Sequence, residues 1–298
     1  MRHVLVPSDL GVIDVAANVT TYNGTIDVNA LAAAEFFVPV YMGSPEDLDV
    51  MGRMPALQVC QLLTAGFDHA LPYLPTGVTL CNAGGVHDAS TAELAIGLML
   101  ASLRGIDDAA RDGATGRWDH RTRPALADRH VVIVGAGGVG NAIRRRLEPF
   151  EVTISMVGRT KRPGVHAAGD LGVLLPTADV VVLAVPLDPT TEAMVDEVFL
   201  ASMKDAALLV NVARGKVVKT DALVAEIATG RIRAALDVTD PEPLPSDHPL
   251  WQLPGVLITP HVGGNSSAFL PRARRMVEAQ VAAWLVGADL AGVVAVAR

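Results

Sequence analysis

Residues 130–140 read HVVIVGAGGVG, and this stretch decides the fold. Its apolar first half predicts a buried strand, and the amphipathic segment 139–147 predicts a helix after it. Between them stand Gly135, Gly137 and Gly140 in the spacing G-x-G-x-x-G. Because these glycines follow a strand and open a helix, the pattern is typical of a loop that binds a dinucleotide.

Each glycine has a distinct task in that interpretation. Gly135 permits the tight turn, Gly137 lets the backbone approach a pyrophosphate, and Gly140 allows the helix to pack closely on the strand. The helix N-terminus adds backbone N–H groups and the positive end of the helix dipole, both of which favour an anion. The alternative is an ordinary strand-to-helix turn that holds no ligand.

The same rhythm of strand, break and helix extends outward from the glycine loop. The predicted strands of this region lie at 131–134, 152–157, 180–185, 208–212, 234–238 and 256–258. Ala-rich amphipathic segments such as 222–229 lie between most of them. Hydrophobicity is continuous along these strands, as expected for burial on both faces. The region therefore predicts an α/β domain with a parallel, doubly wound sheet.

The two ends of the chain predict a second, smaller Rossmann-like domain. Weaker strand patterns lie at 4–6, 37–41, 58–63 and 78–81. The Ala/Leu-rich segment 90–103 predicts a helix long enough to cross between domains, and 271–286 predicts another long helix. We therefore divide the chain into residues 1–93, 94–267 and 268–298. In this division the last segment returns to the first domain.

Composition and charge exclude several classes of protein. The net charge is −8 and the longest basic run is three arginines at 144–146, which argues against nucleic-acid binding. The apolar run 94–103 is ten residues long, short of the roughly 20 that a membrane span needs. Cys60 and Cys81 have neither metal-ligand nor disulfide spacing, so we expect buried, inert thiols and no metal. The sequence predicts a soluble, cytoplasmic protein.

The strand predicted at 152–157 ends in a way that favours NADP(H). In NAD-binding folds this strand is followed by Asp or Glu, which hydrogen-bonds the ribose 2′-hydroxyl. Here Gly158 stands at its end, and Arg159 and Thr160 follow directly. A guanidinium suits a phosphate dianion, so Arg159 with Thr160 is a candidate site for the 2′-phosphate. NAD stays possible, and the alternative is a solvated basic loop.

Three polar residues follow strand-like runs of the same region: Arg214, Glu242 and His261. In an open parallel sheet, ligands bind at the carboxyl ends of the strands, so the three side chains can converge there. Taken singly, Arg214 would be a cation in a solvated turn, Glu242 a charge in a loop and His261 a structural histidine. Together they offer a cation for a carboxylate, an acid for a carbonyl oxygen, and a carboxylate to tune that acid. This set suits the reduction of a 2-oxo acid.

Several motifs, in order and spacing, resemble those of the D-isomer-specific 2-hydroxyacid dehydrogenase family. The matching segments are GAGGVG, AVPLDPTTEAMV, NVARGKVV, AALDVTDPEPLP and LITPHVGGNS. Similarity in the first 90 residues is thinner and rests on LLTAGFDHA and CNAGGVHDASTAE. The resemblance implies a glyoxylate/hydroxypyruvate reductase-like enzyme that acts on a small 2-oxo acid and forms a homodimer. It also implies a substrate-binding domain at 1–93 and an NAD(P)-binding domain at 94–267.

The resemblance further implies a role for each matching residue. Arg214 would bind the substrate carboxylate and polarise its carbonyl, and His261 would be the general acid for reduction and base for oxidation. Glu242 would hold His261 and stabilise its imidazolium. Asp237 would orient the nicotinamide carboxamide. The other cofactor-binding residues would be Gly138, Val139, Val185, Pro186, Thr191, Val212, Ala213, Gly263 and Gly264. The backbone N–H groups of Ala65 and Gly66 would bind the substrate carboxylate.

Some questions stay open at this level. Asp88 stands where a small or hydroxylated residue is expected, so the pair His87–Asp88 has no assigned role. The preferred 2-oxo acid, the physiological direction and the degree of preference for NADP are not encoded in a recognisable motif. Two other functions fit the same residues: a nucleotide-sensing binding protein with this fold, and a dehydrogenase of another small anion such as phosphite.

Overall fold

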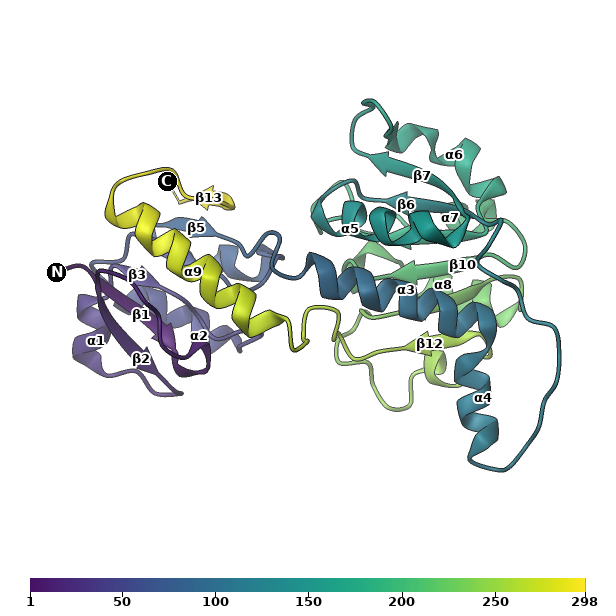
Figure 1. Cartoon of the computed structure of the whole chain (residues 1–298), viewed down its shortest axis with the longest axis horizontal. Coiled ribbons are helices and arrows are strands. Elements are labelled where there is room, and N and C mark those ends of the chain that lie inside the picture. Colours follow the sequence, from purple (N-terminus) through teal and green to yellow (C-terminus); the bar gives the residue numbers. More distant parts are fainter. Residues whose placement is uncertain (298) are drawn as a thin grey trace. The chain divides into compact units, whose positions relative to one another are not determined.

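The computed structural model describes residues 1–297, which form two compact units (Figure 1). The first unit contains Met1–His87 and the C-terminal segment from Ser266, and the second contains Asp88–Asn265. The second unit begins at Asp88 because α3 (Asp88–Arg104) belongs to its core from the first turns, where Ala92 is fully buried. The smaller unit is thus built from both ends of the chain.

The second unit is built on a parallel sheet with the strand order β12-β11-β10-β9-β6-β7-β8. Its strands are β6 (His130–Val134), β7 (Thr153–Gly158), β8 (His166–Ala167), β9 (Val180–Leu183), β10 (Leu208–Asn211), β11 (Arg233–Leu236) and β12 (Val256–Ile258). Its other helices are α4 (Ile106–Gly113), α5 (Gly138–Leu147), α6 (Leu171–Leu174), α7 (Glu197–Ser202) and α8 (Thr220–Ala228). The order reverses at β6, so this sheet is doubly wound, as the sequence predicts.

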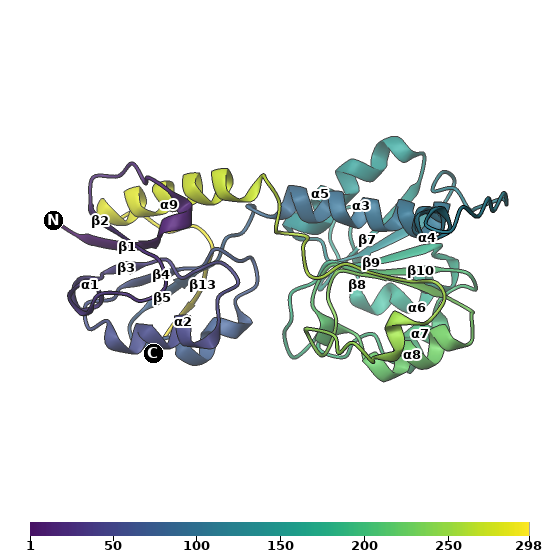
Figure 2. The same ribbon diagram turned by 90° about the horizontal axis from the view of Figure 1, so that it is seen from below.

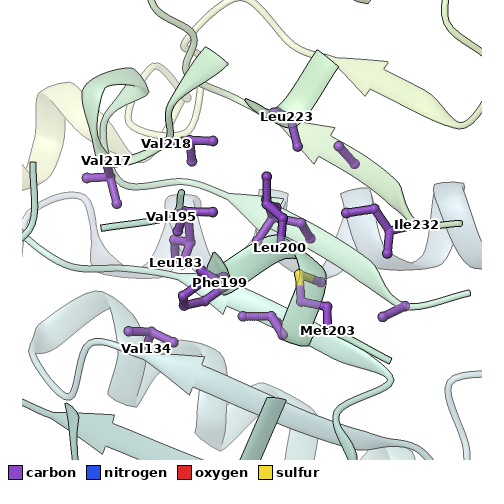
Figure 3. Packing of buried hydrophobic residues seen from close by; sticks show 14 of the residues in the cluster. Val134, Leu183, Val195, Phe199, Leu200, Met203, Val217, Val218, Leu223 and Ile232 are labelled. Atoms are coloured by element: carbon purple, nitrogen blue, oxygen red, sulfur yellow. The ribbon is translucent and has the colours of Figure 1, made fainter. Parts of the chain in front are cut away.

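Helices cover both faces of this sheet (Figure 2). On one face α7 and α8 pack on the sheet around Leu200 and Leu223, in the cluster of Figure 3. On the other face α3 and α5 enclose a second cluster that includes Met99 and Ile143. Burial on both faces is the reason that the strands are continuously apolar.

The first unit has a sheet with the strand order β13-β5-β4-β3-β1-β2. Its strands are β1 (His3–Pro7), β2 (Asn18–Tyr22), β3 (Phe36–Phe37), β4 (Val59–Gln61), β5 (Thr79–Cys81) and β13 (Val293–Val296). Helix α9 (Phe269–Leu285) covers one face, and α1 (Val28–Ala33) and α2 (Pro45–Asp49) cover the other (Figure 2). Alternating strand residues supply the two cores: Val4 faces the α9 side and Leu5 the opposite side.

The structure departs from the sequence-based expectation at the edges of this sheet. Strand β13, which was not predicted, pairs with β5 in the antiparallel sense at one edge of an otherwise parallel sheet. Strand β2 was not predicted either, because its half-exposed, Thr-rich sequence lacks the apolar run of an interior strand. The strand predicted at 37–41 is only Phe36–Phe37.

Two further expectations concern cysteines and membrane spans. Cys60 and Cys81 are both free and fully buried, which confirms the prediction of buried thiols. Burial raises the pKa of the Cys81 thiol to about 11, so it stays protonated and unreactive at neutral pH. Within residues 1–297 no single helix is long and apolar enough to cross a membrane. Only α3 and α4 taken together pass that test, and they are bent by 68°.

Candidate functional site

The glycine loop after β6 has the close packing that its glycines allow. Gly135 has a φ of +121°, and a Cβ there would collide with the backbone carbonyl of Ala184. A Cβ on Gly140 would collide with the carbonyl of Gly135, so α5 can sit against the loop only because Gly140 has no side chain. Beside Gly137, by contrast, no atom lies within 4 Å of where a Cβ would stand. The loop therefore offers open backbone at the N-terminus of α5, which is the arrangement that accepts a phosphate.

Asp88, whose role the sequence left open, lies against this loop. Its carboxylate occupies the place that a Cβ on Gly138 would need. Gly138 is the first residue of α5, where a negative charge is favoured by the helix dipole. His87 is buried in the first unit, where its ring stacks on Tyr41 and Phe269. The two neighbours thus have separate surroundings.

The end of β7 presents two guanidinium groups in place of a carboxylate. A Cβ on Gly158 would stand 3.1 Å from Val165 Cγ1 and 3.6 Å from Arg162 Nη1. Arg162 donates a 2.9 Å hydrogen bond from Nη2 to the Ala136 carbonyl in the glycine loop. Arg162 was not predicted as a site residue from the sequence, although its position three residues after Arg159 was a usable signal.

Arg159 itself is held by a carboxylate from another loop. Its Nη2 lies 2.6 Å from Asp188 Oδ2, in the segment that follows β9. Thr160 is exposed beside it. No pattern in the sequence connects Arg159 with Asp188, because the contact joins residues 29 apart through the sheet order.

The residues expected to line the cofactor site after β9 and β10 lie at the carboxyl ends of these strands. Thr191 donates a 2.7 Å hydrogen bond from its hydroxyl to the Pro186 carbonyl, which fixes the turn after Val185. Val212 and Ala213 are buried directly after β10. Val139, on the first turn of α5, packs against the α3–α5 side of the core.

Asp237 is buried at the end of β11 and organises the segment that carries His261. Its Oδ1 accepts hydrogen bonds from Thr259 Oγ1 at 2.6 Å and from the Val262 N–H at 2.9 Å. Its Oδ2 accepts a 2.9 Å bond from the Gly263 N–H. Three donors from the chain itself therefore fix this carboxylate, and Gly264 continues the same turn.

His261 and Glu242 form a close pair. His261 Nδ1 lies 2.5 Å from Glu242 Oε1. The side chains are 24% and 37% exposed, so the pair is partly shielded but open to a ligand. The His261 backbone has a φ of +51°, a conformation that non-glycine residues adopt rarely and that is found at functional sites. Its N–H donates to the Asp237 carbonyl at 2.8 Å.

Arg214 belongs to the same cluster of charges. The segment after β10 approaches the end of β11 because Gly215 lies against the Thr239 carbonyl, where a Cβ has no room. Burial alone would raise the pKa of the Glu242 carboxyl. The hydrogen bond and charge of His261, with smaller contributions from the Thr239 backbone and the Arg214 charge, hold that pKa below its usual value. The structure therefore brings together Arg214, Glu242 and His261.

Ala65 and Gly66 lie in the first unit. The Ala65 carbonyl accepts a 2.7 Å hydrogen bond from Asn82 Nδ2, and the Gly66 carbonyl accepts one of 2.7 Å from Thr64 Oγ1. The carbonyl groups of this turn are thus bound within the unit.

Among residues 1–297 no group of three or more His, Cys, Asp or Glu side chains is arranged to hold a metal ion.

The doubly wound sheet, the glycine loop and the polar cluster at the strand ends define a Rossmann-type nucleotide-binding unit. Residues 96–263 match the family model described as the NAD binding domain of D-isomer specific 2-hydroxyacid dehydrogenases. The chain belongs to the D-isomer specific 2-hydroxyacid dehydrogenase family.

Individual relatives agree with this assignment. A glyoxylate reductase from Thermofilum pendens is 36% identical over 78% of this chain and 72% of its own length. A human glyoxylate reductase/hydroxypyruvate reductase is 36% identical over 70% of this chain and 67% of its own. The fold is similar to that of an NADPH-dependent glyoxylate/hydroxypyruvate reductase from Sinorhizobium meliloti, solved with NADP and sulfate. That match has a TM-score of 0.86 and 26% identity, over 99% of this chain and 98% of that one.

Proposed function

We propose that this protein is an oxidoreductase that transfers a hydride between NADP(H) and a small 2-oxo or 2-hydroxy acid, of the glyoxylate/hydroxypyruvate reductase type. The observation that carries the proposal is the 2.5 Å contact between His261 Nδ1 and Glu242 Oε1, with Arg214 in the same charge cluster. A protein that only sensed a nucleotide would have no need of an acid, its tuning carboxylate and a substrate cation together. The names of the relatives point to the same class of substrate.

The proposed chemistry divides between these three side chains. Arg214 binds the substrate carboxylate and polarises the neighbouring carbonyl. Because Glu242 contacts Nδ1 of His261, the other ring nitrogen, Nε2, is the one that gives its proton to the carbonyl oxygen. The nicotinamide cofactor, when bound, supplies the hydride. In the oxidation direction neutral His261 takes the hydroxyl proton, and Glu242 stabilises the imidazolium that results.

The second unit has the features that a dinucleotide needs. Gly137 presents open backbone at the N-terminus of α5, where the pyrophosphate would bind. Arg159 and Thr160 would hold the 2′-phosphate of NADP, and Arg162 adds a second cation at the end of β7. The remaining residues proposed to hold the cofactor are Gly135, Gly138, Val139, Gly140, Val185, Pro186, Thr191, Val212, Ala213, Asp237, Gly263 and Gly264.

The first unit is proposed to bind substrate. Its turn at Ala65 and Gly66 has its carbonyl groups bound internally, and we propose that the N–H groups of these residues bind the substrate carboxylate. With the domain limits expected from the sequence, we propose that 1–93 and 268–298 form the substrate-binding domain and that 94–267 form the NAD(P)-binding domain.

We also propose a homodimer in the cytoplasm. The exposed apolar side chains of Ile106 and Trp118, 56% and 92% accessible, support a self-association surface around α4. The apolar residues of α3, in contrast, are used in the core of their own unit. Two buried free cysteines fit a reducing compartment.

The activity is tested by following NADPH oxidation with glyoxylate, hydroxypyruvate, pyruvate and phenylpyruvate, and by repeating each assay with NADH. We expect sustained turnover with glyoxylate or hydroxypyruvate and a higher kcat/KM with NADPH. Nucleotide binding without turnover on any of the four acids would support the sensing protein instead. Turnover with NADP and phosphite alone would point to the dehydrogenase of another anion.

A further inference from the structure

An ion pair spans the glycine loop of the second unit. Arg159 follows β7 and Asp188 lies in the segment after β9, and these two strands flank β6 in the sheet. The contact between Arg159 Nη2 and Asp188 Oδ2 at 2.6 Å therefore reaches across the carboxyl end of β6, where the glycine loop begins. This end of the sheet is where the adenosine half of a dinucleotide binds in the fold.

Asp188 is the fixed partner of this pair. Its Oδ1 accepts hydrogen bonds from the Thr190 N–H at 2.8 Å and the Thr190 hydroxyl at 2.5 Å, and its own N–H donates to Thr191 Oγ1 at 2.9 Å. The bonds from Thr190, together with the charge of Arg159, hold the pKa of the Asp188 carboxyl below its usual value. The negative charge is therefore present throughout the neutral range. Arg159, with a side chain 73% exposed, is the partner that can turn away.

We propose that Asp188 is a specificity-determining residue that opposes the binding of the NADP 2′-phosphate at Arg159. Asp188 thereby lowers the ratio by which NADP(H) is preferred over NAD(H). The inference rests on the proposed function, in which Arg159 receives that phosphate. A phosphate dianion competes for the guanidinium whose Nη2 donates to Asp188 Oδ2, and it must also approach a fixed like charge. A ribose that carries only the 2′-hydroxyl meets neither obstacle.

The test measures the affinity of the full chain for two fragments by calorimetry. Adenosine 2′,5′-bisphosphate carries the 2′-phosphate, and adenosine 5′-monophosphate does not. Asp188→Asn removes the charge but keeps an oxygen that can accept from the Thr190 N–H. Asp188→Ser is a second variant that can also form this turn. The matched control is Asp205→Asn, which removes an exposed carboxylate that pairs with Arg231 at 3.3 Å before β10.

Both Asp188 variants are expected to bind the bisphosphate roughly three- to tenfold more tightly, as follows from removing one exposed like charge. Their affinity for the monophosphate is expected to change less than about twofold. The gain should become smaller when Arg159→Ala is added, because only the repulsion between Asp188 and the phosphate then remains. It should also shrink in high salt, because exposed charges are screened. The control variant should change neither affinity.

The outcomes distinguish an error in the role of Asp188 from an error in the phosphate site at Arg159. If Arg159→Ala weakens only the bisphosphate but the Asp188 variants give no selective gain, the role of Asp188 is wrong and the proposed phosphate site stands. If Arg159→Ala affects both fragments equally or neither, the phosphate site itself is wrong, and the role of Asp188 fails with it. A gain of undiminished size in the absence of Arg159 would also overturn the proposed role.

Discussion

The Glu242 carboxylate contacts the ring of a histidine at the carboxyl end of the sheet. Its pKa lies below the usual value, so the charge is present at neutral pH and is lost only as the pH falls through that lowered value. An anion at this distance stabilises the imidazolium of His261. The contact occupies Nδ1 and leaves Nε2 of His261 for the substrate.

Glu242→Gln is expected to move the pH dependence of both reactions. The amide keeps the shape of the side chain but removes the negative charge that favours the charged form of the facing ring. Reduction should then decline at lower pH than in the wild type, and oxidation should persist to lower pH. Rates of NADPH oxidation and NADP reduction across pH give the two profiles. Glu192→Gln, at an exposed position, is the control. Unchanged profiles would mean that the pairing does not tune the acid, and Asp240 would become the candidate partner.

At the scale of elements, two glycines of α5 that lie near the glycine loop have different surroundings. Gly140→Ala places a Cβ against the backbone carbonyl of Gly135, which cannot move without displacing the helix. Gly138→Ala places one against the Asp88 carboxylate, which can rotate away. We expect the Gly140 variant to lose about 1–3 kcal/mol of unfolding free energy and most of its affinity for NADPH.

The Gly138 variant is the matched comparison for that prediction. Its unfolding free energy should stay within about 1 kcal/mol of the wild type, because alanine is the better helix former. Urea denaturation gives the stabilities and calorimetry gives the affinities. Equal losses in both variants would show that the close packing of α5 on the loop is not what Gly140 provides.

Asp179 joins the amino ends of β6 and β9. Its Oδ2 accepts from the His130 N–H at 2.9 Å, and its Oδ1 lies 2.6 Å from Lys204 Nζ and 3.2 Å from Arg129 Nη1. Burial alone would raise the pKa of this carboxyl, but these partners lower it. A lowered folded-state pKa stabilises the protein above the unfolded-state value of about 3.9. That stabilisation is lost as the pH falls further, through the folded-state value.

Asp179→Asn should therefore cost about 1–3 kcal/mol of unfolding free energy at neutral pH. The difference from the wild type should shrink as the pH falls below about 4. Asp205→Asn, at a side chain 87% exposed, should cost less than about 1 kcal/mol. Thermal unfolding at several pH values provides the comparison. A cost for Asp179→Asn that did not depend on pH would contradict the electrostatic explanation.

Over the whole molecule, the sequence predicted what depends on local pattern. Interior strands such as β9 and β10 are apolar throughout because both faces are covered, and the glycine spacing marks its own loop. The edge strand β2 escaped prediction because an edge needs fewer apolar residues. Strand β13 was missed although all four of its residues, VVAV, are apolar. The contacts that Asp88 and Asp188 make escaped it too, because they depend on which loops the sheet order brings together.

The proposed function depends most on the role of His261 as the proton donor, and one measurement tests this role directly. That measurement is the kcat for NADPH oxidation with glyoxylate in the wild type and in His261→Ala, taken with the calorimetric Kd for NADPH. We expect a fall in kcat of roughly 10²–10⁴ and an NADPH Kd within about twofold of the wild type. A His261→Ala variant that kept kcat within about threefold while binding NADPH normally would contradict this role.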